Sequence, residues 1–506
     1  MEKITVMDTT MRDGEQTPGI AFTPEEKAML GRMLYNAGVD FIEVASAQVS
    51  GGEKSGAIAV VKEFEEHGYP TDILECLTYL TKESVDWAHD TGVGGVNILA
   101  KSSVEQIEKQ LRMKPEDQTN LVLDIVEYAY DLDMKVNLYL EHFSSKGGVK
   151  DTPEYADTLI NELLQTKKMQ RITFCDTLGL FDPDEVKRYV GKFVKKYPKA
   201  FFDFHGHNDY GMAVANTLEA VRVQCKGVQV TVNGLGERTG NAPLEEVIVA
   251  IHDKTDKKTN VKEYMLKELS SLVERSSGVR IPQNKPIVGK YAFTHKSGIH
   301  VDGMSKAKLY ESIDPSRFGR RHEYDLGKHS GKATIRSHLE EMGIKPTDKL
   351  IEGILKRVKE YGDMKKVLSS EDLPYIIADL MEAPEDIRIE IEDCAIVTAL
   401  GTHPVATVSI KRNGKIYKTT GSGVGGYDAF MNAIRSLFKE ELPKLVDYEV
   451  TIPPGGKTDA LVYTTITWED KDGNVFKTIG VSPDQTFAAI EATKKMLNRF
   501  YRNKKT

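Results

Sequence analysis

Cysteine is scarce in this chain, and its scarcity excludes a small domain held together by disulfides. Only 4 of the 506 residues are cysteines, and they are too far apart to form a Cys-x-x-Cys pair. This usage is typical of a reducing compartment and predicts a cytoplasmic protein. The length predicts two or three domains, because a single hydrophobic core rarely organises so many residues.

Long apolar runs and an excess of positive charge are also absent. No segment has the length and apolarity of a membrane-spanning helix. The opening residues, MEKITVMDTT, lack the basic-then-apolar order of a signal peptide. The formal net charge is -8 with both signs mixed, which argues against a nucleic-acid surface. We therefore expect small-molecule substrates and neither a membrane nor a nucleic-acid partner.

The first half of the chain contains one repeated pattern, in which short apolar or β-branched runs alternate with longer amphipathic stretches. Several of these stretches begin with Thr or Asp followed by Glu, as helix N-caps do. Eight strand–helix units in roughly 250 residues predict a (β/α)8 barrel. An open, doubly wound sheet is the alternative, but no Gly-x-Gly-x-x-Gly follows the first run. The eight runs are residues 3–9, 40–46, 71–77, 95–100, 135–141, 171–177, 201–207 and 227–234.

Beyond the predicted barrel of residues 1–270, the composition changes twice. Residues 271–386 contain a Gly-, Pro- and Ser-rich connector followed by helical patterns. Residues 387–506 repeat the order strand, Asn-Gly or Asp-Gly turn, strand, Gly-rich bend and helix, which predicts a duplicated α+β domain. The bends at residues 421–426 and 480–484 could present backbone N–H groups to an amino-acid carboxylate. We expect ligand sensing or dimerisation here, with a purely stabilising domain as the alternative.

Ionisable residues follow several predicted strands, and a barrel gathers them at one rim. His205 and His207, in the sequence FDFHGHND, lie one strand step apart and point to the same face. Alone they would be ordinary loop histidines, but with Asp13 they make three ligands and leave coordination positions open, as in a catalytic metal site. Oxygen from Asn241 would add a ligand, which favours Mg2+ or Mn2+ over a tetrahedral zinc.

The other rim residues each have a structural alternative. Asp8 could cap the segment that follows it. Arg12 could be held in an ion pair with Glu237 or another rim carboxylate, a common role for a buried arginine. Glu15 and Arg238 could lock loops without touching a substrate.

Five motifs resemble, in order, the signatures of the 2-isopropylmalate, homocitrate and citramalate synthases. They are DTTMRDGEQTPG, HGHNDYGMAVAN, NGLGERTGNAPLEEV, SGIHVDG and LGKHSGK. The resemblance covers essentially the whole chain, including the duplicated tail, which resembles the allosteric domain of that family. It implies an acyltransferase that uses acetyl-CoA, a 2-oxo acid and a divalent metal (Mn2+, Mg2+ or Zn2+). It also implies a homodimer with a branched-chain amino-acid effector. One departure is YLEHFSSKGG, where relatives often have Asp-Trp after the Glu.

The resemblance also implies roles for single residues. The forked donors of Arg12 suit a developing alkoxide or enolate oxygen, and Thr177 would hydrogen-bond the substrate carboxylate. The base that takes a proton from acetyl-CoA is Glu141, whose apolar neighbours would raise its pKa, or His300, with Tyr310 ten residues later. The alternatives are a rim ion pair between Glu141 and a lysine, and a loop-stabilising hydrogen bond for His300.

The side-chain pocket for the 2-oxo acid is expected near the ends of the third, fourth and fifth strands, at Cys76, Leu99 and Tyr139. Cys76 is small, which favours 2-oxoisovalerate and therefore 2-isopropylmalate synthesis. Pyruvate, which would give citramalate, is the alternative, because Leu99 and Tyr139 could close the pocket unaided. None of the three residues is basic, which argues against a substrate with a second carboxylate.

Two further classes stay open. A barrel lyase or aldolase could share the metal cluster, but the SGIH connector and the repeated tail argue against it. A non-catalytic amino-acid sensor is the other, and the intact Arg-Asp-Glu and His-x-His sets argue against that.

Overall fold

The computed structural model describes most of the chain in two compact units. These units are Met1–Thr294 with Ser312–Glu323, and His295–Glu311 with Tyr324–Thr506. The expected division into three parts, with boundaries at residues 270 and 386, stays a prediction. The described residues are 3–295, 313–320, 323–324, 332, 335–336, 339, 346–363, 389–412, 414–438, 442–451, 462–482 and 484–502.

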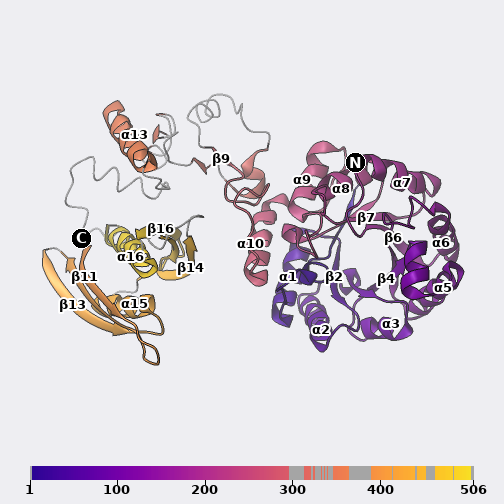
Figure 1. Ribbon diagram of the computed structural model, residues 1–506, viewed down its shortest axis with the longest axis horizontal. Helices are drawn as coiled ribbons and strands as arrows, with labels where there is room; N and C mark the ends of the chain where they lie inside the picture. Colours follow the sequence, from indigo (N-terminus) through magenta and orange to yellow (C-terminus); the bar gives the residue numbers. More distant parts are fainter. Residues whose placement is uncertain are drawn as a thin grey trace. The chain divides into compact units, whose positions relative to one another are not determined.

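The first unit is a closed barrel of eight parallel strands in the order β1 to β8, which confirms the predicted (β/α)8 fold. Helices surround the strands (Figure 1). The strands are β1 Thr5–Asp8, β2 Phe41–Ser46, β3 Leu74–Thr78, β4 Gly95–Lys101, β5 Lys135–Glu141, β6 Met169–Asp176, β7 Phe202–Gly206 and β8 Gly227–Val230. The main helices are α1 Pro24–Ala37, α2 Gly51–Glu66, α3 Lys82–His89, α5 Pro115–Asp131, α6 Pro153–Thr166, α7 Pro183–Lys196, α8 Ala213–Arg222, α9 Leu244–Lys254 and α10 Leu266–Ser277.

Local sequence signals explain where these helices begin. Thr23 precedes α1, and its side chain accepts a hydrogen bond from the backbone N–H of Glu26. In return, the backbone N–H of Thr23 donates to the Glu26 carboxylate. Asp182 and Glu185 form the same reciprocal capping box at the start of α7. Within the described ranges, no helix combines the length and apolarity that crossing a membrane requires.

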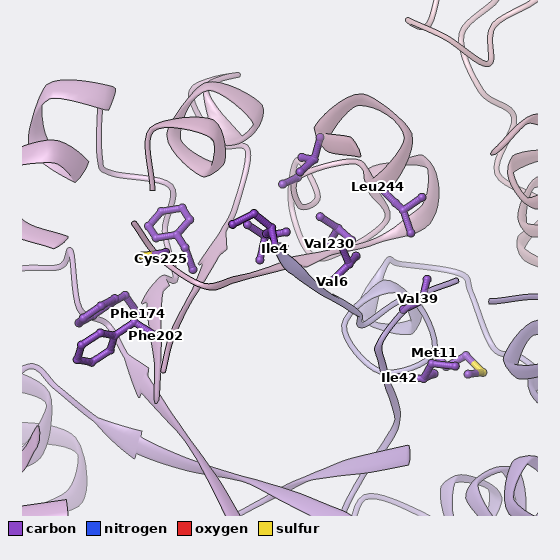
Figure 2. Close-up of a cluster of buried hydrophobic side chains, with 14 of the residues drawn as sticks. Ile4, Val6, Met11, Val39, Ile42, Phe174, Phe202, Cys225, Val230 and Leu244 are labelled. Carbon is purple, nitrogen blue, oxygen red and sulfur yellow. The ribbon is translucent and has the colours of Figure 1, made fainter. Parts of the chain in front are cut away.

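A single apolar core lies between the strands and the surrounding helices. Figure 2 shows part of it, including Phe174 of β6 and Phe202 of β7. Their stacked rings lie 4.9 Å apart between centroids. Leu272 and Val273 of α10 belong to the same core, so the packing of the barrel continues past residue 270.

The interior of the barrel is unusually polar. Strand residues alternate between the two faces of the sheet, and many of the inward-facing ones carry amide or charged groups where apolar side chains usually pack. One buried example is Arg171, whose Nη2 donates to Oε1 of Glu75 at 2.6 Å. The buried polar residues of the strands include Glu43, Glu75, Asn97, Asn137, Arg171, Thr173, Asp203 and Gln229.

The second unit contains the predicted repeat. Each half is an antiparallel three-stranded sheet, in the orders β11-β12-β13 and β14-β15-β16, with one helix after it. Both predicted hairpins are present, but each half has one further strand that was not predicted, β11 in the first and β14 in the second. The elements are β11 Ile389–Val397, β12 Val405–Arg412, β13 Lys415–Ser422, α15 Gly426–Leu437, β14 Lys444–Thr451, β15 Val462–Glu469, β16 Val475–Ser482 and α16 Gln485–Arg502, with α13 Asp348–Asp363 preceding them.

The Gly-rich bends of this unit bring strand and helix backbones close together. A Cβ on Gly421 would lie 2.3 Å from the backbone N of Ala433, and one on Gly480 would lie 1.8 Å from the backbone O of Ala488. In the first bend, Gly423 N donates to Pro404 O at 3.1 Å. These glycines therefore have a packing role that is independent of any carboxylate ligand.

Candidate active site and metal centre

The structure brings Asp13, His205 and His207 together at the carboxyl rim of the barrel. Their ligand atoms all lie within 4.8 Å of one another. His205 Nε2 is 3.4 Å from Asp13 Oδ2 and 3.2 Å from His207 Nε2. The turn after β1 fixes the position of Asp13, because the backbone N–H of Asp13 donates to Thr9 O at 2.8 Å.

The electrostatics of this cluster suit a cation. Burial alone would raise the pKa of Asp13, but the charges of Arg12, His205 and His207 outweigh it and lower that pKa to about 2. Burial, reinforced by His207, lowers the pKa of His205 to about 3, and burial also lowers the pKa of His207. At neutral pH the site therefore offers a carboxylate and two neutral imidazoles, the protonation states that bind metals.

Unpaired buried oxygens support the same conclusion. Among the described residues, Asp13 Oδ1 and Asn241 Oδ1 are buried without a hydrogen-bond partner. The amide of Asn241 donates to Leu235 O at 3.0 Å, and Asn241 pairs with His207 in an isolated β-bridge. A buried acceptor without a donor is costly, and a divalent cation would satisfy both oxygens. The four predicted ligands therefore fit a metal ion, although their metal role stays a prediction.

Arg12 lies beside this cluster and is held by a carboxylate that was not among the predicted site residues. Its Nη1 is 3.1 Å from Asp13 Oδ2, and its Nε donates to Glu43 Oε2 at 2.5 Å. Arg12 therefore forms ion pairs with Asp13 and Glu43, and Glu237 pairs with Arg238. The sequence contains a signal for this role, because Glu43 is the only charged residue of FIEVAS, whose other residues are apolar or small.

Glu43 is completely buried and is itself surrounded by donors. Its Oε1 accepts from Asn97 Nδ2 at 2.8 Å and from the Tyr139 hydroxyl at 2.9 Å. Tyr139 therefore lies inside the barrel near Arg12, and its role in the substrate pocket stays a prediction. Its hydroxyl donates to Glu43, and the residue packs with Leu77 and Cys175.

Two candidate residues follow β5 and β6. Glu141 Oε2 is 2.5 Å from Lys101 Nζ, which is the rim ion pair considered above as the alternative to a catalytic base. Thr177 Oγ1 accepts from the backbone N–H of His142 at 2.8 Å. His142 has a left-handed backbone, with φ at 60°, an uncommon conformation for a non-glycine residue. The Thr177 hydroxyl itself donates to the backbone O of Cys175 at 3.4 Å, a longer hydrogen bond than the one it accepts.

The remaining rim residues behave as structural supports. Asp8 accepts from Thr10 N at 2.9 Å and so caps the turn, and burial raises its pKa to about 7. Glu15 accepts from Phe22 N at 2.8 Å. Arg238 donates to Asp209 Oδ1 at 2.8 Å and links two loops.

The expectation for Cys76 was wrong by one residue. Cys76 is buried in the core between the strands and the helices. The next residue, Leu77, instead clusters with Tyr139 and Cys175, with Leu99 packed against them. Glu75 of the same strand shows which residues face inward, because it contacts Arg171 in the barrel interior and side chains alternate along a strand.

The other two candidates cannot be placed. His300 and Tyr310 lie outside the described residues.

The fold and the site together define a (β/α)8-barrel enzyme with a candidate divalent-metal centre at its carboxyl rim. An HMGL-like family model matches residues 3–273, a homocitrate synthase post-HMGL domain-like model matches residues 287–366, and a LeuA allosteric (dimerisation) domain model matches residues 367–501. The chain belongs to the HMGL-like family and, within it, to the acyltransferases of the LeuA type.

Two relatives illustrate the range of this family. "Probable 2-isopropylmalate synthase" of Methanopyrus kandleri is 37% identical over 511 residues, which cover 100% of this chain and 99% of the relative. "(R)-citramalate synthase CimA" of Methanocaldococcus jannaschii is 35% identical over 470 residues, which cover 92% of each chain. Because the chain is similarly identical to both kinds of synthase, sequence identity does not distinguish between their 2-oxo acid substrates.

Proposed function

We propose that this enzyme condenses acetyl-CoA with pyruvate to form citramalate. The observation that carries this proposal is the apolar cluster of Leu77, Leu99, Tyr139 and Cys175 inside the barrel. The cluster lies close to Arg12, because the Tyr139 hydroxyl is 2.9 Å from Glu43 and Glu43 accepts from Arg12.

The size of these residues favours a methyl group over an isopropyl group. A preference for 2-oxoisovalerate would need a small residue such as Cys76 at the pocket, but the inward-facing residue is the bulkier Leu77. With Leu99 and Tyr139 it would fill the space that a branched side chain needs. No member of the cluster is charged, which argues against a second carboxylate on the substrate.

The roles proposed for the chain follow from its chemistry. Asp13, His205, His207 and Asn241 would hold a divalent metal, which would act as a Lewis acid toward the 2-oxo acid. Arg12 would stabilise negative charge that develops on oxygen, and the Thr177 hydroxyl would donate to the substrate carboxylate. Glu141 or His300 would remove a proton from the acetyl methyl group. The resulting carbanion would form the new C–C bond at the keto carbon, the C=O π electrons would move to the oxygen, and that oxygen would take up a proton. Water would then hydrolyse the thioester and release the CoA thiol.

The test is a comparison of two neighbouring residues on opposite faces of β3. The wild-type enzyme should have a kcat/KM for pyruvate at least tenfold above that for 2-oxoisovalerate. Leu77→Ala should move this ratio toward 2-oxoisovalerate by roughly 10- to 200-fold, because even one methylene group in an apolar pocket discriminates by about 1–3 kcal/mol. Cys76 faces the helices, so Cys76→Ala should alter thermal stability and leave the ratio unchanged. Release of the CoA thiol measures both substrates.

Contrary results would be informative. A wild-type preference for 2-oxoisovalerate would make the enzyme a 2-isopropylmalate synthase and refute the pocket argument. A shift of the ratio in Cys76→Ala and not in Leu77→Ala would mean that the assignment of the two faces is wrong. No thiol release with any 2-oxo acid would refute condensation itself.

We also propose that the enzyme is a homodimer inhibited by a branched-chain amino acid. The match of residues 367–501 to an allosteric (dimerisation) domain supports this. Truncation near residue 387 should abolish inhibition by leucine or isoleucine, because it removes both repeat halves. Initial rates with each amino acid, with and without the tail, check this. An active truncated enzyme that is still inhibited would contradict the proposal.

A further inference from the structure

A continuous row of side-chain hydrogen bonds crosses the barrel interior and ends at Arg12. Arg171 Nε donates to Asn137 Oδ1 at 3.3 Å. Asn137 Nδ2 donates to Asn97 Oδ1 at 3.0 Å. Asn97 Nδ2 donates to Glu43 Oε1 at 2.8 Å. Asn97 and Asn137 are fully buried, so water does not compete for these groups.

The direction of these hydrogen bonds is determined by chemistry. Amide oxygen and nitrogen look alike in most structures, and only the network assigns them. A guanidinium can only donate, so Asn137 must turn its oxygen to Arg171 and its nitrogen to Asn97. Asn97 must then accept with its oxygen and donate with its nitrogen. Arg171 thereby determines, through two intervening amides, that Asn97 presents its Nδ2 donor to Glu43.

We propose that Asn97 and Asn137 are positioning residues that orient Glu43 and, through it, the guanidinium of Arg12. Asn97 and Tyr139 occupy Oε1 of Glu43, which leaves Oε2 to receive Arg12 Nε. With Nε held in this way, Nη1 of Arg12 points to Asp13. A preorganised donor stabilises a transition state because it does not have to reorient during the reaction. This inference rests on the proposed condensation.

Substitution at Asn97 tests the row of donors. Asn97→Leu removes the donor with little change in volume, and kcat should fall on the order of tenfold or more while the KM for the 2-oxo acid changes less than threefold. The matched control is Asn216→Leu, because Asn216 is a buried asparagine that donates to the backbone O of Phe181. It should lower the thermal unfolding temperature and leave kcat within twofold.

Asn97→Asp provides a readout that a purely structural role would not give. The introduced carboxyl group can donate to Glu43 only when it is protonated. It would face Glu43, Asn137 and the neighbouring charges of Arg12, Glu75 and Arg171, and the ionised form would repel Glu43. The kcat of this variant should therefore decrease as pH rises from 5.5 to 8.5 by roughly tenfold beyond any change in the wild type.

The outcomes separate this inference from the proposed function. The wild-type assay decides whether the enzyme condenses acetyl-CoA with a 2-oxo acid. Crystal structures of wild type and Asn97→Leu then test the positioning whatever the substrate is. A displaced contact between Glu43 and Arg12 is expected. An unchanged contact, or a kcat within twofold of wild type in Asn97→Leu, or a wild-type pH profile in Asn97→Asp, would each overturn the positioning role.

Discussion

Chelation of divalent metal should abolish turnover, and Mn2+ or Mg2+ should restore it. The expectation follows from Asp13, His205 and His207, which converge within 4.8 Å, and from the unpaired oxygen of Asn241. These groups would polarise the 2-oxo acid only with a cation between them. The measurement is thiol release after EDTA treatment and after addition of each metal, with metal content determined on the same samples.

Replacement of one ligand should have the same effect. His207→Ala should lose bound metal and at least a thousandfold of kcat, which corresponds to about 4 kcal/mol. His67→Ala is the control, because His67 is a partly exposed histidine after α2 whose Nδ1 contacts the backbone O of Glu63. It should keep wild-type metal content and activity. Full turnover by metal-free His207→Ala would show that the cluster does not bind a catalytic metal.

The sequence predicted the barrel and the ligand cluster because both depend on simple periodicity. Eight runs of strand length predict eight strands, and residues just past parallel strands meet at one rim. His205 and His207 could be paired because neighbouring positions on one face differ by two. Asp13 and Asn241 could be predicted to join them because both follow barrel strands and therefore lie at the same rim.

The sequence does not directly reveal which residues of a buried strand face the barrel interior and which face the helices. In β3, Leu74, Cys76 and Leu77 are all apolar and all buried, so hydrophobicity alone does not reveal which of them face the interior. Only the polar neighbour Glu75, buried against Arg171 across the barrel, fixes the phase. Glu43 was missed for a related reason, since a charge inside an apolar strand seems unfavourable until its donors are known.

The pair of Arg12 and Glu43 leads to the last prediction. Glu43→Gln should lower kcat by about 10²–10³, equivalent to about 2.7–4 kcal/mol, with a small change in KM. Asn97 and Tyr139 would hold the new amide oxygen at the position of Oε1. The amide nitrogen would then face Arg12 Nε, and two donors cannot bond to each other. Arg12 would therefore lose the orientation that directs Nη1 toward Asp13.

A buried carboxylate outside the barrel interior is the appropriate control. Glu245 is 1% exposed, and its Oε1 is 3.2 Å from Lys285 Nζ. Glu245→Gln should reduce stability, because it leaves a buried ammonium without its full partner, and should preserve kcat. If Glu43→Gln loses stability to the same extent but keeps its kcat, Glu43 supports the fold alone.

A double variant distinguishes positioning from direct action by Glu43. If Glu43 acts only through Arg12, the loss in Arg12→Leu already includes the contribution of Glu43. The double variant Arg12→Leu with Glu43→Gln should then be no slower than Arg12→Leu alone, which is the non-additivity expected of residues that act as one unit. If the two losses multiply, Glu43 contributes to the reaction separately from Arg12, and the ion pair is not the reason for its place in the barrel.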